Sequence, residues 1–267
     1  MRTSQLTSVA SALSVVALTL SSGAASAATL RLGASTQAWY NQFGVNSAVV
    51  ENQDGPVFNT FTGFFNGVEF RSYYVFDVGA IASPIASGVL KLSPKRYYSS
   101  INRETVTLYD VATPVDDLIN NQRVATFDDL GNGEEYGHGV IVANPTVNPD
   151  FIFDPQTAFI TITLTEAAIQ AINQAIKNKQ SFALGLSLVS AGDSPFILNN
   201  NFIAEGVLFS GGVTDPVSDN GFQSELILEE ARSNPDDPRA IPELFSVWGI
   251  LVACSIGLGF KPSPQPS

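Results

Sequence analysis

The chain has 267 residues, with 25 Asp or Glu against 13 Lys or Arg, a formal net charge of −12 and a pI near 4.3. This acidity argues against binding nucleic acid through a basic surface and against docking on anionic lipid through charge. Hydrophobic residues make up 45% of the chain and charged residues 14%. That is enough apolar material for a sizeable core, so the composition is not that of a disordered acidic protein.

The N-terminus has the pattern of a secretory signal peptide. One basic residue, Arg2, precedes an apolar stretch at Val9–Leu20 and a run of small residues that ends in Ala25-Ser26-Ala27. Twelve apolar residues are too few to cross about 30 Å of hydrocarbon, whereas the A-x-A ending suits signal peptidase. We therefore expect residues 1–27 to be a cleaved signal helix and the protein to be exported.

Between residues 28 and 230 the dominant hydrophobic period is two. Alternation of apolar and polar residues is typical of strands with one buried and one solvated face. Several such strands, joined by turn-rich loops, predict an all-β domain, an antiparallel β-sandwich or jelly roll. The residues predicted to face inward are Tyr74, Phe76, Val78, Leu90, Leu92, Val106, Leu108, Ile160, Ile162, Leu164, Phe182, Leu184, Leu186, Leu188, Leu226 and Leu228.

One segment, TEAAIQAINQAIKNKQ, has a helical period instead. Thr165 suits the N-cap, and Glu166 places a negative charge in the first turn. Ile169, Ile172 and Ile176 form a single apolar stripe. The pattern predicts one crossover helix of about three turns that covers an open end or edge of the sandwich.

The C-terminal part begins with a proline- and charge-rich linker at residues 231–243, which ends at Pro242-Glu243. The next 17 residues, Leu244–Phe260, are nearly uncharged, and Lys261 and a short tail at 262–267 follow. We expect a membrane helix at 244–261, although 17 residues span only about 25 Å. A core strand or helix of the globular domain is the alternative.

This C-terminal block resembles the PEP-CTERM sorting signal of exported bacterial proteins. That signal consists of a Pro-Glu-Pro-like motif, one membrane helix and a basic tail; here the motif reads Pro242-Glu243-Leu244 and the tail holds one lysine. The resemblance implies transient anchoring in the inner membrane and recognition by an exosortase-like processing enzyme that cuts near Pro242-Glu243. It also implies a bacterium that makes extracellular polysaccharide.

Two internal segments carry a second resemblance. Residues 69–94 (EFRSYYVFDVGAIASPIASGVLKLSP) and 106–118 (VTLYDVATPVDDL) are similar to the β-sandwich modules of PEP-CTERM proteins. The resemblance implies a fold and marks no catalytic residue. It also implies a distant likeness to carbohydrate-binding jelly rolls, which is analogy at the level of fold alone.

Acidic residues gather in turn-rich segments, and three interpretations stay open. Carboxylates on turns could hold Ca²⁺, they could be solvated loop residues, or two of them could form a glycosidase pair across a cleft. The candidates for calcium are Asp128, Asp129, Glu134 and Glu135, and the wider cluster adds Asp110, Asp116 and Asp117.

The chain holds a single histidine, His138, and a single cysteine, Cys254. They make no structural zinc site and no internal disulfide. A Ser-His-Asp triad would need His138, but no G-x-S-x-G nucleophile motif accompanies it. We therefore interpret His138 as a loop residue without a catalytic role.

Aromatic residues are the remaining candidates for a binding surface. Two adjacent pairs, Trp39-Tyr40 and Tyr97-Tyr98, could stack on sugar faces if their rings are exposed, or could belong to the core. The sequence thus predicts a non-catalytic, exported protein of the cell surface or extracellular matrix, with no cofactor. Binding of extracellular polysaccharide is the alternative function, followed by a glycan-active enzyme.

Overall fold

The computed structural model describes residues 27–50, 59–142, 159–189, 191–193, 196–197, 203–209 and 224–231. Residues 27–232 form one compact unit. Residues 1–26 of the predicted signal peptide, residues 232–243 of the predicted linker, which include Pro242-Glu243, and the apolar segment Leu244–Phe260 lie outside the described residues. Within the described ranges, no helix combines the length and apolarity that crossing a membrane requires.

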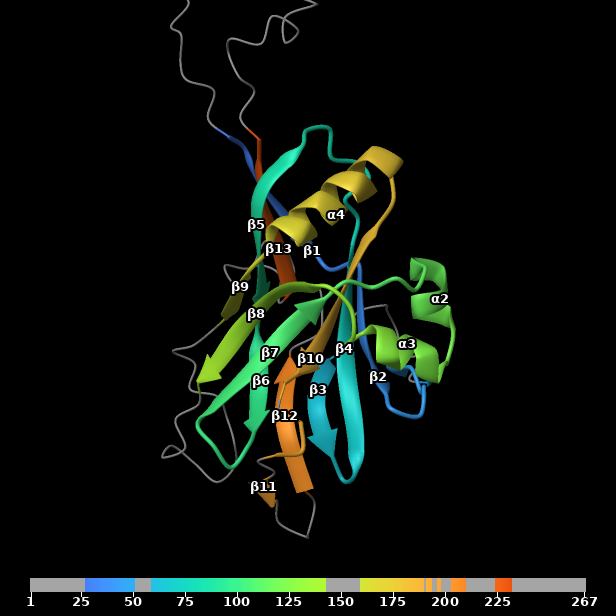
Figure 1. Cartoon of the computed structure of the whole chain (residues 1–267), viewed down its shortest axis with the longest axis vertical. Coiled ribbons are helices and arrows are strands. Elements are labelled where there is room, and N and C mark those ends of the chain that lie inside the picture. Colours follow the sequence, from blue (N-terminus) through green and yellow to red (C-terminus); the bar gives the residue numbers. More distant parts are fainter. Residues whose placement is uncertain are drawn as a thin grey trace, which may run out of the picture. The chain divides into compact units, whose positions relative to one another are not determined.

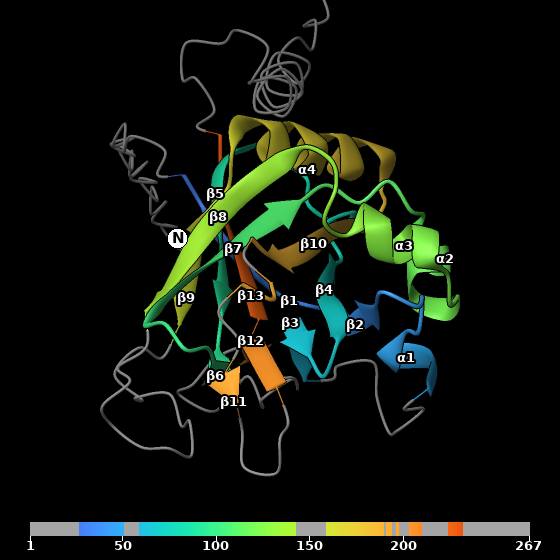
Figure 2. The ribbon, with the colours of Figure 1, turned by 60° about the horizontal axis from the view of Figure 1, so that its bottom comes forward.

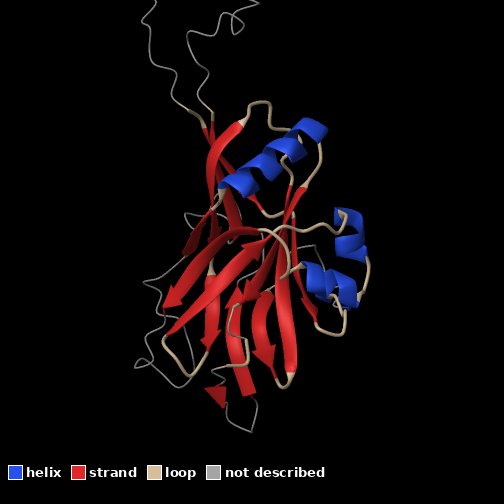
Figure 3. Ribbon diagram, viewed as in Figure 1, coloured by secondary structure: helices blue, strands red, loops and turns tan. Residues whose placement is uncertain are grey.

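The described residues form two antiparallel sheets (Figures 1 and 3). The smaller sheet has the order β1-β13-β5-β9, and the larger one runs β11-β12-β3-β4-β10-β7-β8, with β2 on β4 and β6 on β12. The strands are β1 Thr29–Gly33, β2 Thr36–Asn41, β3 Thr60–Phe65, β4 Val68–Phe76, β5 Ile85–Leu92, β6 Pro94–Tyr98, β7 Arg103–Tyr109, β8 Glu135–Val142, β9 Ile160–Thr163, β10 Phe182–Leu188, β11 Phe196–Ile197, β12 Ile203–Phe209 and β13 Ser224–Glu230. The predicted antiparallel β class is confirmed.

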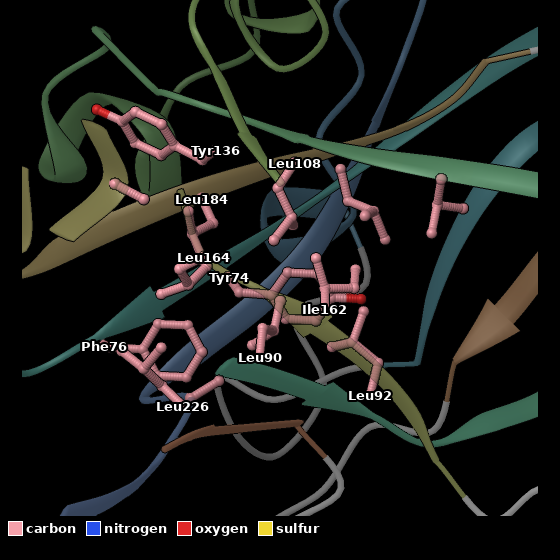
Figure 4. Packing of buried hydrophobic residues seen from close by; sticks show 14 of the residues in the cluster. Tyr74, Phe76, Leu90, Leu92, Leu108, Tyr136, Ile162, Leu164, Leu184 and Leu226 are labelled. Atoms are coloured by element: carbon pink, nitrogen blue, oxygen red, sulfur yellow. The ribbon is translucent and has the colours of Figure 1, made fainter. Parts of the chain in front are cut away.

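Side chains from both sheets form the main core. Every residue predicted to face inward is buried in one cluster, so period-two alternation identified the inner face of each strand correctly. Leu90 and Leu92 of β5 enter this cluster from the smaller sheet, and Leu108 and Leu184 enter it from the larger one (Figure 4). Burying one such side chain stabilises the fold by about 1.5–3 kcal/mol.

The helix α4 (Glu166–Asn178) is the predicted crossover helix, between β9 and β10. Thr165 caps it, because its Oγ1 accepts a hydrogen bond from the Ala168 N–H at 3.4 Å. Ile172 is fully buried. Asn173 fastens the helix to β5: its Nδ2 donates to the Ile85 carbonyl at 2.9 Å, and its Oδ1 accepts from the Ile85 N–H at 2.7 Å.

Three short helices lie outside the prediction of a single helix, which is therefore incomplete. They are α1 (Ser47–Val50), α2 (Val115–Asn120) and α3 (Val124–Asp129). Leu118 of α2 and Phe127 of α3 pack in a second cluster with the faces of β2 and β4 that point away from the main core. The members of this second cluster from β2 and β4 are Ala38, Tyr40, Tyr73 and Val75. Here β4 is buried on both faces.

The two ends of the compact unit leave it side by side. β1 and β13 pair with Thr29 opposite Glu229, and the Glu230 N–H donates to the Ala28 carbonyl at 3.0 Å. Figure 1 shows the hairpin between β3 and β4 at the opposite end of the unit.

Candidate functional site

Two of the four aromatic residues predicted as a binding surface are buried. Tyr40 is fully buried, and its hydroxyl lies 2.6 Å from the Asn121 carbonyl oxygen and 2.9 Å from that of Leu118. Burial raises the pKa of this hydroxyl above its ordinary value. Tyr97 is 5% exposed and donates to the Ile101 carbonyl at 2.9 Å. Neither ring can serve as a platform for a solvent ligand.

The other two, Trp39 and Tyr98, end a row of four part-exposed rings that crosses four strands. Trp39 of β2 packs edge-to-face on Phe70 of β4 at 5.1 Å between ring centroids, and Phe70 contacts Phe61 of β3 at 5.5 Å. Phe61 contacts Tyr98 of β6 at 6.2 Å. We call Trp39, Phe70, Phe61 and Tyr98 the aromatic row. The sequence predicted the two outer residues, Trp39 and Tyr98, but not Phe70 and Phe61 between them, because only strand pairing brings these rings together.

The aromatic row lies at the end of the unit that is opposite to the chain ends. Trp39 is two residues before the end of β2, and Phe70 lies opposite Asn41 near the β3–β4 hairpin. Two exposed apolar side chains occupy the same end: Phe65 at the hairpin is 37% exposed, and Phe43, just after β2, is 65% exposed. This end of the unit therefore offers apolar and aromatic surface to solvent.

Two of the four acidic residues predicted as calcium ligands bond to neighbouring groups of the protein through their carboxylates. The Asp129 carboxylate accepts from the Thr113 N–H at 2.7 Å and from the Ala112 N–H at 3.3 Å. Glu135 lies 2.8 Å from His138 Nδ1. Asp128 and Glu134 are exposed, and the described residues hold no group of three His, Cys, Asp or Glu side chains suited to a metal.

The rest of the wider acidic cluster is also dispersed. Asp110 Oδ1 accepts from the Glu134 N–H at 2.6 Å, and Asp117 accepts from the Asn121 side chain at 2.6 Å. His138 is exposed on β8, and its one described partner is Glu135. Asp116 is different, because it lines a pocket.

A pocket of about 510 Å³ lies between α4, the segment that leads into α2, and the start of β10. In Figure 2, α4 lies above β10 and the α2–α3 pair lies beside it. A volume of 300–1,000 Å³ is typical of small-molecule sites. The pocket is lined by Val111, Ala112, Thr113, Pro114, Val115, Asp116, Tyr136, Ala171, Gln180, Ser181, Phe182 and Ala183.

Tyr136 and Phe182 form the aromatic part of this lining. Their rings are stacked, with centroids 6.1 Å apart and planes inclined by 21°. The position of Tyr136 is fixed through its backbone, because its carbonyl accepts from the Thr165 N–H at 3.0 Å. Gly137 lets β8 lie close to the end of β9, because a Cβ added at this glycine would lie 2.5 Å from the Thr163 carbonyl oxygen.

Sequence reasoning did not select Tyr136. It lies in the segment EEYGHG, which reads as a turn-rich loop because of its two glycines. In the structure the segment begins β8, and its glycines face β9 closely. The alternation of Gly137, Gly139 and Ile141 with His138 and Val140 was the available signal, because glycine in a strand marks close packing.

Comparison with known proteins gives no relative. The chain matches no protein-family model, and a search of curated proteins finds no matching sequence. The function is therefore argued from the residues and their geometry.

Proposed function

We propose that the chain is an exported, non-catalytic protein of the bacterial cell surface or extracellular matrix. The observation that carries this proposal is the C-terminal order of linker, Pro242-Glu243, the apolar segment Leu244–Phe260 and Lys261. Acidic residues precede the apolar segment and a lysine follows it, which suits a helix whose N-terminal side is translocated. A signal peptide at residues 1–27 would place the β domain on that same side.

The fold of residues 27–232 suits this arrangement. We assign it to the β-sandwiches, since side chains from two antiparallel sheets share one core. Because the chain leaves the unit beside its own N-terminal strand, a C-terminal tether would leave the aromatic row facing away from the tethered end.

Processing of the C-terminus tests this proposal. Expressed in a host with an exosortase-like enzyme, the mature protein should end near Pro242 and leave the membrane fraction. In a host without that enzyme, the intact tail should hold the protein in the inner membrane. Mass spectrometry of C-terminal peptides after fractionation measures both. Peptides from Leu244–Lys261 on soluble, folded protein would overturn the sorting proposal.

Binding of extracellular polysaccharide is the second candidate function, and the aromatic row favours it. Aromatic rings stack on the apolar faces of sugars, and a row across neighbouring strands offers several rings to an extended chain. Trp39 and Tyr98 are the outer members, so they are the first residues to substitute.

A pull-down with polysaccharide from the producing bacterium tests this second candidate. Trp39→Ala should weaken binding about tenfold, since an aromatic contact worth about 1.5 kcal/mol corresponds to a factor of about ten. Val124→Ala is the matched control, because Val124 is 50% exposed on α3 outside the row. Equal retention of both variants and the unsubstituted protein would exclude the row as the binding surface.

A glycan-active enzyme is disfavoured. Glycosidases place two carboxyl groups across a cleft, at about 5 to 9.5 Å from one another. Among the described residues that line the pocket, Asp116 is the one carboxylate. A glycosidase pair in this pocket would need a second carboxyl group opposite Asp116, and the other described lining residues do not supply one.

A further inference from the structure

The pocket beneath α4 contains a hydrogen-bonding group without a protein partner among the described residues. Tyr136 is 7% exposed, and its hydroxyl makes no hydrogen bond to any residue that the structure describes. Figure 4 shows this hydroxyl pointing away from the aliphatic side chains of the core. Among the described residues, the fully buried side-chain polar atom without a partner is Ser224 Oγ, so the Tyr136 hydroxyl is in contact with the solvent of the pocket. There it is free to donate to an acceptor atom from outside the chain.

The surroundings of this hydroxyl keep it in its protonated form. Burial, followed by the negative charges of Asp110 and Glu134, raises the pKa of Tyr136 to about 12. The phenol is therefore protonated at physiological pH and can donate its hydrogen. Asp116 is the one charged residue in the lining. A negative wall disfavours an anionic ligand, so the acceptor should be a neutral oxygen.

The remaining lining combines small apolar residues with hydrogen-bonding side chains. The stacked rings of Tyr136 and Phe182 are 7% and 6% exposed, so they bound the pocket without offering an open ring face, and small apolar residues such as Ala171 flank them. Gln180 and Asp116 lie in the same lining. An amide and a carboxylate both accept hydrogen bonds from hydroxyl groups, and the amide also donates them. A sugar ring presents this same mixture of an apolar face and hydroxyl groups.

We propose that the pocket beneath α4 binds a neutral saccharide unit, with a sugar oxygen accepting a hydrogen bond from the Tyr136 hydroxyl and a sugar hydroxyl donating to Asp116. The apolar face of the sugar packs against small apolar residues of the lining such as Ala171. This site shares no residue with the aromatic row. The inference is therefore independent of the proposed function, and each can fail without the other.

The test uses the full-length chain and four probes: glucose, cellobiose, glucuronate and tetramethylammonium chloride. Saturation-transfer NMR and calorimetric titration measure binding of each. We expect a neutral sugar to bind and glucuronate to bind more weakly. Tyr136→Phe, which keeps the ring and removes the hydroxyl, should weaken sugar binding about threefold to tenfold, the loss of one hydrogen bond. The melting temperature should stay unchanged, because that hydroxyl has no protein partner.

Two further variants make the test specific. Ala171→Leu fills the pocket from α4 and should abolish sugar binding without touching the hydroxyl. Tyr109→Phe removes a phenol hydroxyl on β7, outside the pocket lining, and should bind like the unsubstituted protein. Absence of binding by both neutral sugars overturns the proposal, as does unchanged sugar binding by Tyr136→Phe. Preferred binding of tetramethylammonium overturns it in favour of a cation site.

Discussion

Two buried tyrosines lie near the helices that flank the larger sheet, and their hydroxyls have opposite environments. The Tyr40 hydroxyl, beneath α2, lies 2.6 and 2.9 Å from the carbonyl oxygens of Asn121 and Leu118. The Tyr136 hydroxyl, beneath α4, has no partner among the described residues and faces a pocket of about 510 Å³. The first region is closed by its own polar groups, and the second leaves a hydroxyl without a protein partner among the described residues, at the wall of a pocket.

Asn46 explains why the first region is closed. It is fully buried, and its Nδ2 lies 3.0 Å from the carbonyl oxygens of both Leu118 and Ile119 and 3.1 Å from the Tyr40 hydroxyl. Its Oδ1 accepts from the Ala48 N–H at 3.1 Å. One side chain thus pairs the C-terminal carbonyls of α2, which a helix cannot satisfy internally. The pocket beneath α4 has no such central residue.

The largest expected loss of stability comes from a substitution in α4, the helix above the pocket. Ile172→Asp puts an unpaired charge at a fully buried position of α4 and should lower the free energy of unfolding by about 4 kcal/mol or more. Urea denaturation measures this. Gln174→Asp, on the exposed face of the same helix, should change it by less than about 0.5 kcal/mol. A mild effect of Ile172→Asp would mean that α4 does not pack as described.

The second largest loss of stability should come from substituting Asn46, which pairs the buried polar groups beneath α2. Asn46→Ala leaves several buried partners unpaired and should lower the free energy of unfolding by about 3 kcal/mol. Asn120→Ala is the control, because Asn120 is exposed and makes one side-chain bond, to the Asp116 carbonyl. Similar losses in the two variants would contradict the central role of Asn46.

High pH should distinguish the pocket tyrosine. The pKa of Tyr136 is raised from 10.0 to about 12 in the folded state. Below pH 10 the phenol is neutral in both the folded and the unfolded state, so its titration has no effect on stability there. Stability should fall as the pH rises from about 10 toward about 12, because the unfolded state ionises first. Tyr136→Phe has no phenol at this position, so its stability should fall less steeply across that window. Parallel stability curves from alkaline urea titrations would show that Tyr136 is not buried as a neutral phenol.

Much of the fold followed from the sequence, because local pattern reports local burial. The alternation in FITITL identified Ile160, Ile162 and Leu164 as inward, and the stripe of isoleucines with Thr165 identified α4. Those patterns depend on single strands and one helix, each of which buries one side against the main core.

What the sequence did not indicate depends on contacts between distant segments. The short helices α2 and α3 have six residues each, too few to show a helical period. Tyr40 read as a candidate surface ring because alternation cannot reveal that helices cover the second face of β2 and β4. Tyr136 was missed because its pocket is assembled from α4, the segment before α2 and the start of β10.

The contrast between the two tyrosines can be tested directly by removing each hydroxyl separately. Urea denaturation near pH 7 of Tyr40→Phe and Tyr136→Phe compares two chemically identical changes at buried rings. Tyr40→Phe should lower the free energy of unfolding by about 1.5 kcal/mol, because it removes a buried hydroxyl that is bonded to backbone carbonyls and to Asn46. Tyr136→Phe should leave it unchanged or slightly raised. Equal losses in the two variants would show that the Tyr136 hydroxyl is already satisfied within the protein, and would contradict a pocket with a donor reserved for a ligand.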